Sequence, residues 1–92
     1  DAHAGHTETS VLLHLSPELV RTEDAAPGNT EPLAELLPRL RDGGVAAVSA
    51  SGVLGDPTTA TATAGETILA DMVTDCVARV QRWKPGLDGM LM

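Results

Sequence analysis

Apolar residues recur at helical spacing in three segments of the chain, and each segment predicts a helix. The strongest pattern covers residues 62–83, where the apolar positions lie three or four residues apart and share one side of a helix. These positions are Ile68, Leu69, Met72, Val73, Cys76, Val77, Val80 and Trp83. Because such a stripe is normally buried, we expect this face to pack against the rest of the protein, with Cys76 as a small buried side chain.

A shorter helix is predicted at residues 8–15, where the sequence reads ETSVLLHL. Thr7 is the expected N-cap, since its hydroxyl can accept a hydrogen bond from a free backbone amide of the first turn. Glu8 lies at the N-terminal end of a face that is otherwise suited to burial and continues through Val11, Leu12 and Leu15. Residues 17–20 are expected to add one more helical turn.

The third predicted helix covers residues 31–42 and follows the polar loop 21–30. Thr30 is its expected N-cap. Pro38 falls inside this helix and removes a backbone donor, so we expect a kink or a break into two shorter helices. The glycine pair at 43–44 is expected to end the helix.

Residues 45–50, VAAVSA, are the only segment that predicts a β-strand. The run is apolar almost throughout, as in a strand that is buried on both faces of a sheet. One strand cannot form a sheet by itself, so its partners must lie in other sequence or in another chain. The pattern therefore predicts a portion of a larger α/β domain that is mostly helical within residues 1–92.

The composition restricts the possible partners and location. A net charge of −7, from 13 acidic and 6 basic residues, argues against nucleic acid and against an anionic membrane surface. No apolar run approaches the roughly 20 residues that cross a bilayer. The single cysteine cannot form an internal disulfide, which favours a reducing compartment such as the cytoplasm.

Candidate chemistry is concentrated in the first ten residues, DAHAGHTETS. His3, His6 and Glu8 are spaced as H-x-x-H-x-E, and imidazole nitrogens and carboxylate oxygens are good ligands for Zn, Fe or Mn. An acidic residue in a first helical turn is also favoured by the helix dipole alone. The spacing by itself therefore leaves a metal site and a helix-stabilising role for Glu8 both open.

Two motifs together resemble the creatininase family of metal-dependent amidohydrolases. Residues 3–5 (HAG) and 8–10 (ETS) are similar to the H-A-G-x-x-E-T-S segment of that family. Residues 52–57 (GVLGDP) are similar to the G-V-x-G-D-P loop that precedes its last helix. The two motifs occur in the expected order and together cover most of the chain.

The resemblance implies a fold and a site. Residues 1–92 would form the C-terminal part of a layered α/β/α domain, without its N-terminal half, in a family whose members assemble into hexamers. Glu8 matches the motif glutamate, at or beside the metal pair, and His3 matches the motif histidine, which contacts substrate and moves protons. His6 occupies a variable position and is a possible substrate or metal contact. The second motif is expected to be a structural loop, with its turn formed at Gly52, Gly55 and Asp56.

The implied activity is hydrolysis of a C–N bond that depends on a divalent metal, Zn, Fe or Mn, with most ligands in the absent half. Through residues 5–10, 14–21, 43–45 and 53–57 the chain is most similar to peptidases of cofactor maturation, which remove a C-terminal Val-Tyr dipeptide from a modified precursor peptide. Hydrolysis of a cyclic amide such as creatinine and a non-catalytic role in assembly are the alternatives. The chain offers about one ligand where three are usual, so we expect it to be inactive by itself.

Overall fold

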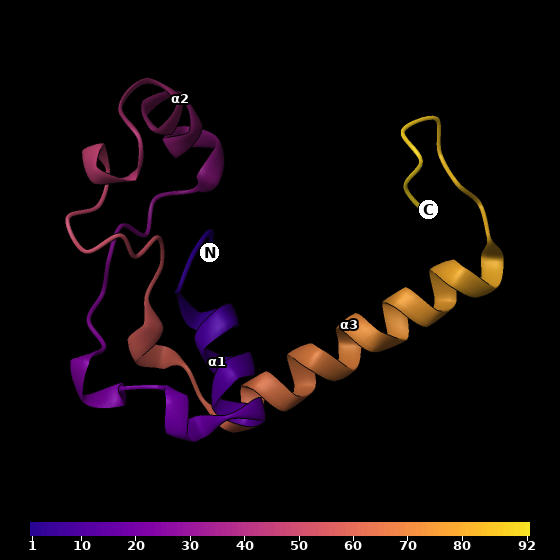
Figure 1. Ribbon diagram of the computed structural model, residues 1–92, viewed down its shortest axis with the longest axis horizontal. Helices are drawn as coiled ribbons and strands as arrows, with labels where there is room; N and C mark the ends of the chain where they lie inside the picture. Colours follow the sequence, from indigo (N-terminus) through magenta and orange to yellow (C-terminus); the bar gives the residue numbers. More distant parts are fainter.

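A long helix extends from a lobe that holds the two shorter helices and the N-terminus (Figure 1). The computed structural model describes all residues, 1–92. Its helices are α1, His6–Leu15, α2, Leu33–Gly43, and α3, Ala62–Arg82. Short 3₁₀ turns occupy the connecting segments at Pro17–Leu19, Thr22–Asp24, Val45–Ala47 and Pro57–Thr59.

The predicted helices at 62–83 and 8–15 are confirmed as α3 and α1. The hydroxyl of Thr61 caps α3 by accepting a hydrogen bond from the Ala64 amide at 3.0 Å. The predicted N-cap of α1 is wrong, because α1 begins at His6 and Thr7 is already inside it. A carboxylate from earlier in the chain replaces the hydroxyl, since Asp1 Oδ2 accepts from the Thr7 amide at 3.1 Å.

Helix α2 forms at the predicted place, but its N-cap and its path through Pro38 differ from the prediction. It begins at Leu33, so Thr30 does not cap it. The helix continues through Pro38 as one element. The Ala34 carbonyl, which loses its donor at Pro38, belongs to an exposed residue and can bind water instead. Gly44, with φ of +74°, ends the helix as expected.

The predicted strand at 45–50 is wrong. Residues Val45–Ala47 form a 3₁₀ turn, in which the amides of Ala47 and Val48 donate to carbonyls three residues earlier, at 3.2 and 3.0 Å. A strand must exchange hydrogen bonds with a neighbouring strand, and the 92 residues contain only two isolated antiparallel bridges. Without a partner, the backbone satisfies its polar groups locally.

The chain packs most closely where α1 crosses α3. Ser10 of α1 is completely buried at this crossing, and its hydroxyl accepts a hydrogen bond from the Thr61 amide at 3.2 Å. Gly65 of α3 lies against the Ser10 backbone so closely that a Cβ atom there would overlap the Ser10 carbonyl oxygen. The close approach of the two helices therefore requires glycine at position 65.

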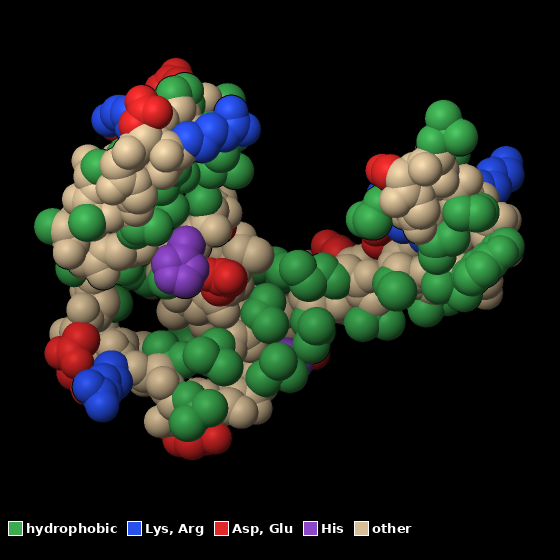
Figure 2. Space-filling model, turned by 45° about the horizontal axis from the view of Figure 1, so that its top comes forward, with side chains coloured by type: hydrophobic (Ala, Val, Ile, Leu, Met, Phe, Trp, Pro, Cys, Tyr) green, Lys and Arg blue, Asp and Glu red, His purple; other side chains and the backbone are tan.

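The expected burial of the α3 stripe does not occur within these 92 residues. Hydrophobic side chains line α3 where it extends beyond the lobe (Figure 2), and the exposed ones include Met72, Val73, Val77 and Val80. Cys76 is exposed as well, so the prediction that it is buried is wrong for this chain. The radius of gyration is 15.8 Å, against about 12 Å for a compact domain of this length. No helix, α3 included, has both the length and the apolar character needed to cross a membrane.

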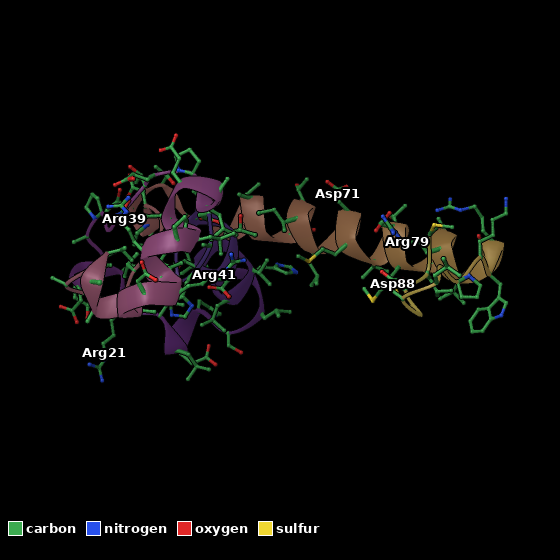
Figure 3. The ribbon with its side chains drawn as sticks, turned by 90° about the horizontal axis from the view of Figure 1, so that it is seen from above. Arg21, Arg39, Arg41, Asp71, Arg79 and Asp88 are labelled. Carbon is green, nitrogen blue, oxygen red and sulfur yellow. The ribbon has the colours of Figure 1, made fainter.

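The tail that follows α3 folds back as a small hairpin. Pro85 and Leu91 form an antiparallel bridge, and the guanidinium groups of Arg79 and Arg82 donate to the carbonyls of Leu91 and Met92 at 3.0 and 3.2 Å. Arg79 and Asp88 accordingly lie at the same end of the molecule (Figure 3). Arginines in the last turns of α3 thus hold the tail in place.

Replacing Gly65 with alanine should destabilise the chain. Alanine favours an exposed helix by about 1 kcal/mol over glycine, but its methyl group here would collide with the Ser10 backbone, which cannot rotate away. We expect the free energy of unfolding to fall by about 1–3 kcal/mol, as for an overpacked core. Urea denaturation followed by helical circular dichroism measures this change.

Glu66→Ala is the matched control, because Glu66 is exposed and lies in the same turn of α3. It should change the free energy of unfolding by no more than about 0.5 kcal/mol. A Gly65→Ala variant as stable as the wild type would contradict the close crossing of α1 and α3.

Candidate metal-binding and catalytic site

The two sequence motifs are joined through the backbone. The amides of Ala2 and His3 donate to the Leu54 carbonyl at 2.9 and 3.2 Å, and the Leu54 amide donates to the His3 carbonyl at 2.9 Å. On its other edge the same segment bonds to the loop before α2, where the amides of Gly28 and Asn29 donate to Gly55 and Val53 at 2.9 and 3.1 Å. The backbone of His3 is therefore fixed beside the second motif.

His3 and Glu8 are brought together at the start of α1. The Nδ1 atom of His3 lies 3.6 Å from Glu8 Oε2, and the same oxygen accepts a hydrogen bond from the Ala4 amide. Ala4 has a φ of +53°, so the chain turns sharply between the two functional side chains. The His3 and Glu8 side chains are 63% and 62% exposed, so their attraction is screened by solvent and adds little to stability. Their exposure leaves both accessible to a ligand.

His6 belongs to a different environment. Its Nδ1 atom lies 2.9 Å from the hydroxyl of Thr59, in the turn Pro57–Thr59. Residues two apart on a helix do not face each other, so His6 and Glu8 point to different sides of α1. The structure thus brings His3 and Glu8 together and places His6 against the second motif's turn.

The second motif forms a tight, well-braced loop. Gly52 and Gly55 have φ values of +85° and +152°, which favour glycine. A Cβ atom on Gly55 would lie 2.7 Å from the Asp1 Cβ atom and 2.9 Å from the Gly5 Cα atom. Asp56 Oδ1 accepts a hydrogen bond from the Thr58 amide at 3.0 Å and so caps the turn. The loop is packed directly against the residues that precede α1.

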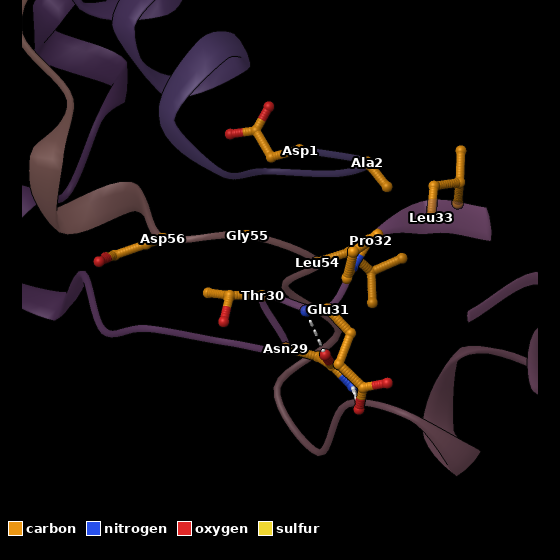
Figure 4. A pocket seen from close by; sticks show the side chains of 10 residues that line it. All are labelled: Asp1, Ala2, Asn29, Thr30, Glu31, Pro32, Leu33, Leu54, Gly55 and Asp56. Atoms are coloured by element: carbon orange, nitrogen blue, oxygen red, sulfur yellow. Dashed lines mark hydrogen bonds between the residues drawn. The ribbon is translucent and has the colours of Figure 1, made fainter. Parts of the chain in front are cut away.

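Asp1 has a role that the sequence did not reveal, because nothing in its local pattern marks it as a cap. Besides accepting from Thr7, it lines a hollow of about 290 Å³ between the N-terminal segment and the start of α2 (Figure 4). Glu31 and Asp56 line the same hollow. Asn29 also went unnoticed, and its side chain accepts from the Glu31 amide at 2.9 Å and donates to the Val48 carbonyl at 2.9 Å.

The donor atoms fit part of a metal site. The Glu8 carboxylate suits a divalent ion such as Zn, Fe or Mn, and the His3 ring lies beside it, with Nδ1 3.6 Å from Oε2. No group of three or more His, Cys, Asp or Glu side chains within residues 1–92 could hold a metal ion. The chain can therefore contribute one or two ligands, and a complete site needs donors from other sequence.

Comparison with known proteins shows the family of the chain. The family model named Creatininase, described as creatinine amidohydrolase, matches residues 1–80. The chain belongs to the creatininase family. Both motifs lie inside the matched range, and the tail hairpin at 84–92 lies outside it. No solved structure gives a significant match to the chain.

Several curated relatives carry the name mycofactocin precursor peptide peptidase. The protein from Mycobacterium ulcerans is 71% identical over 91 residues, which is 99% of this creatininase-family chain and 36% of the relative. The protein from Mycolicibacterium smegmatis is 65% identical over 91 residues, covering 99% of the chain and 37% of the relative. That from Mycobacterium tuberculosis strain H37Rv is 69% identical over 91 residues, with 99% and 36% covered. The chain thus spans a little over a third of the length of these relatives.

Alanine at Gly55 should disturb the site more than alanine at Gly52. Both glycines have positive φ, so both changes introduce backbone strain, of about 1–2 kcal/mol. Only Gly55 also faces neighbouring atoms, whereas a Cβ atom on Gly52 would meet nothing within 4 Å. We expect Gly55→Ala to lower the free energy of unfolding by about 1–3 kcal/mol more than Gly52→Ala does. Urea denaturation of the two variants checks this, and equal losses would contradict the packing of the motif loop on Asp1 and Gly5.

Proposed function

We propose that this chain is part of a metal-dependent peptidase that releases a C-terminal Val-Tyr dipeptide from the mycofactocin precursor peptide. The observation that carries the proposal is the 65–71% identity over 99% of the chain to proteins named mycofactocin precursor peptide peptidase. The closeness of His3 and Glu8, at positions that match the family's motif, supports it. Because the chain spans a little over a third of these relatives, the activity is proposed for the longer protein.

Each of the two side chains has a defined part in the proposed reaction. Glu8 would hold the metal with its carboxylate, since Oε2 also accepts from the Ala4 amide and is thereby kept in place. A bound divalent ion, Zn, Fe or Mn, supplies Lewis-acid polarisation of the scissile carbonyl and activates water. His3 would transfer a proton to the leaving amide nitrogen. His3 suits this role because its ring is accessible to substrate and lies beside the carboxylate.

We further propose that the chain forms the C-terminal part of a layered α/β/α domain, in a hexameric cytoplasmic enzyme. The expanded shape of the chain and its exposed α3 stripe support the first part of this proposal, a domain whose core is completed by other sequence. The remaining metal ligands would lie in that sequence, so the 92 residues alone should not hydrolyse substrate. Recovery of activity by the 92 residues on addition of metal alone would overturn this proposal.

Creatinine hydrolysis is the second candidate, because the matching family model is described as creatinine amidohydrolase. The two candidates share the metal chemistry and differ in substrate. Assays of the natural-length protein with a peptide ending in Val-Tyr and with creatinine separate them. Turnover of creatinine without peptide cleavage would favour the second candidate, and turnover of neither would favour a role in assembly.

Glu8→Ala in the natural-length protein should reduce both metal affinity and peptide hydrolysis. Loss of groups that merely support metal ligands costs about 10–100-fold, so loss of a direct ligand should cost about 100-fold or more. Isothermal titration with Zn, Mn and Fe(II) and a peptide-cleavage assay measure the two effects. Glu18→Ala is the control, because Glu18 is exposed in the turn Pro17–Leu19 and should change neither quantity. Unchanged metal affinity in Glu8→Ala would contradict the assignment.

Cys76 should be accessible in the 92-residue chain and protected in the natural-length protein. Its thiol is exposed here on the stripe that we propose the rest of the domain covers. Labelling with iodoacetamide, read by peptide mass spectrometry, should be about 10-fold or more slower in the longer protein, because burial suppresses thiolate reactivity. The longer protein in urea serves as the control for intrinsic reactivity. Equal rates in the folded longer protein and the chain would show that the α3 stripe stays uncovered.

A further inference from the structure

We propose that Thr59 is a positioning residue that holds His6 with its proton on Nδ1, so that Nε2 offers a free electron pair to a peptide N–H of the substrate. The substrate half of this inference rests on the proposed peptidase function, whereas the tautomer half does not. His3 and Glu8 are the pair assigned to chemistry, and His6 stands apart from them. The proposal gives the turn Pro57–Thr59, which directly follows the second motif, a part in substrate binding.

The hydrogen bonds around the Thr59 hydroxyl determine which nitrogen of His6 carries the proton. Oγ1 of Thr59 lies 2.9 Å from His6 Nδ1 and 3.2 Å from the Asp56 carbonyl oxygen. A hydroxyl has one proton, and a carbonyl oxygen can only accept. Both contacts are hydrogen bonds only if Oγ1 donates to Asp56 and accepts from Nδ1–H.

The opposite tautomer would lose one of these bonds. With the proton on Nε2, the Thr59 hydroxyl would have to turn its proton to His6 Nδ1, and its own hydrogen bond to the Asp56 carbonyl would be lost. A hydrogen bond made by one ring nitrogen is the usual way in which proteins fix the state of the other. In the neutral ring, the geometry therefore leaves the lone pair on Nε2.

The position of Thr59 is itself fixed by the second motif. Asp56 caps the turn by accepting from the Thr58 amide at 3.0 Å, and Pro57 at the start of the turn restricts the backbone. The branched side chain of Thr59 has few χ1 rotamers, which favours a single direction for Oγ1. The turn thus presents the hydroxyl to α1 in a prearranged position.

His6 Nε2 is available for a ligand. Within residues 1–92 the ring makes one hydrogen bond, through Nδ1, and His6 is only partly buried. It belongs to no cluster of side chains that could hold a metal ion. An accepting nitrogen without a metal partner, in the first turn of the helix that carries Glu8, is suited to a backbone N–H of a peptide.

Nitrogen-15 spectra of the natural-length protein, labelled at histidine, test the tautomer directly. We expect Nδ1 of neutral His6 to have a protonated shift and Nε2 an unprotonated one, with the His6 signals identified by their loss in His6→Gln. Thr59→Val should move the proton to Nε2 in most molecules, and Thr59→Ser, which keeps the hydroxyl, should retain the wild-type pattern. A wild-type ring protonated on Nε2, or an unchanged ring in Thr59→Val, would overturn the proposal; if Thr59→Val fails to fold, the wild-type spectrum decides.

Kinetics with a peptide ending in Val-Tyr test the contact with substrate. Thr59→Val should raise KM by about 3- to 10-fold, the effect of one hydrogen bond, with little change in kcat. Thr59→Ser should restore the wild-type KM. A shifted tautomer with an unchanged KM would overturn the substrate contact. Absence of peptide cleavage by the wild type would overturn the proposed function, while the spectra would still decide the role of Thr59.

Discussion

Backbone hydrogen bonding along residues 53–55 is the constraint on which the candidate site depends. This segment bonds on one edge to Ala2 and His3 and on the other to Gly28 and Asn29. It thereby holds together three stretches that are far apart in the sequence, although none of them is long enough to count as a strand. Because the bonds involve main-chain atoms, they fix the path of the chain at His3 without constraining its imidazole. The side chain remains free to face solvent and ligand.

Close packing at the same segment explains the glycines at positions 5 and 55. Asp1, Gly5 and Gly55 meet where the N-terminal loop crosses the second motif, and a Cβ atom at Gly55 would fill the space. The Asp1 carboxylate reaches the Thr7 amide only because the chain is packed this closely. The start of α1, with Glu8 in its first turn, is therefore oriented by contacts that also define the loop 52–57.

The crossing of α1 and α3 anchors the long helix at one end and leaves the rest of it uncovered. Ser10 is fully buried against Gly65. The apolar side chains further along α3, Val73 and Val77 among them, remain exposed. Hydrophobic burial is the main favourable term in folding, and here only Leu36 and Leu54 are buried hydrophobic residues. The apolar stripe on α3 is thus exposed surface that a further part of the protein could bury, with a gain in stability.

The sequence by itself determined the places of the helices and the membership of the creatininase family, and it predicted His3, His6 and Glu8 as residues of the candidate site. Helical periodicity is a local property and needs no knowledge of contacts, so α1, α2 and α3 follow from spacing, with errors of a few residues at their ends. The cap supplied by Asp1 was not visible, because it depends on a turn that brings residue 1 back to Thr7. The segment 45–50 has the composition of a buried strand, yet a strand exists only when another strand pairs with it. Likewise, the tertiary structure alone decided that His6 meets Thr59, since these two residues are 53 positions apart and share no sequence pattern.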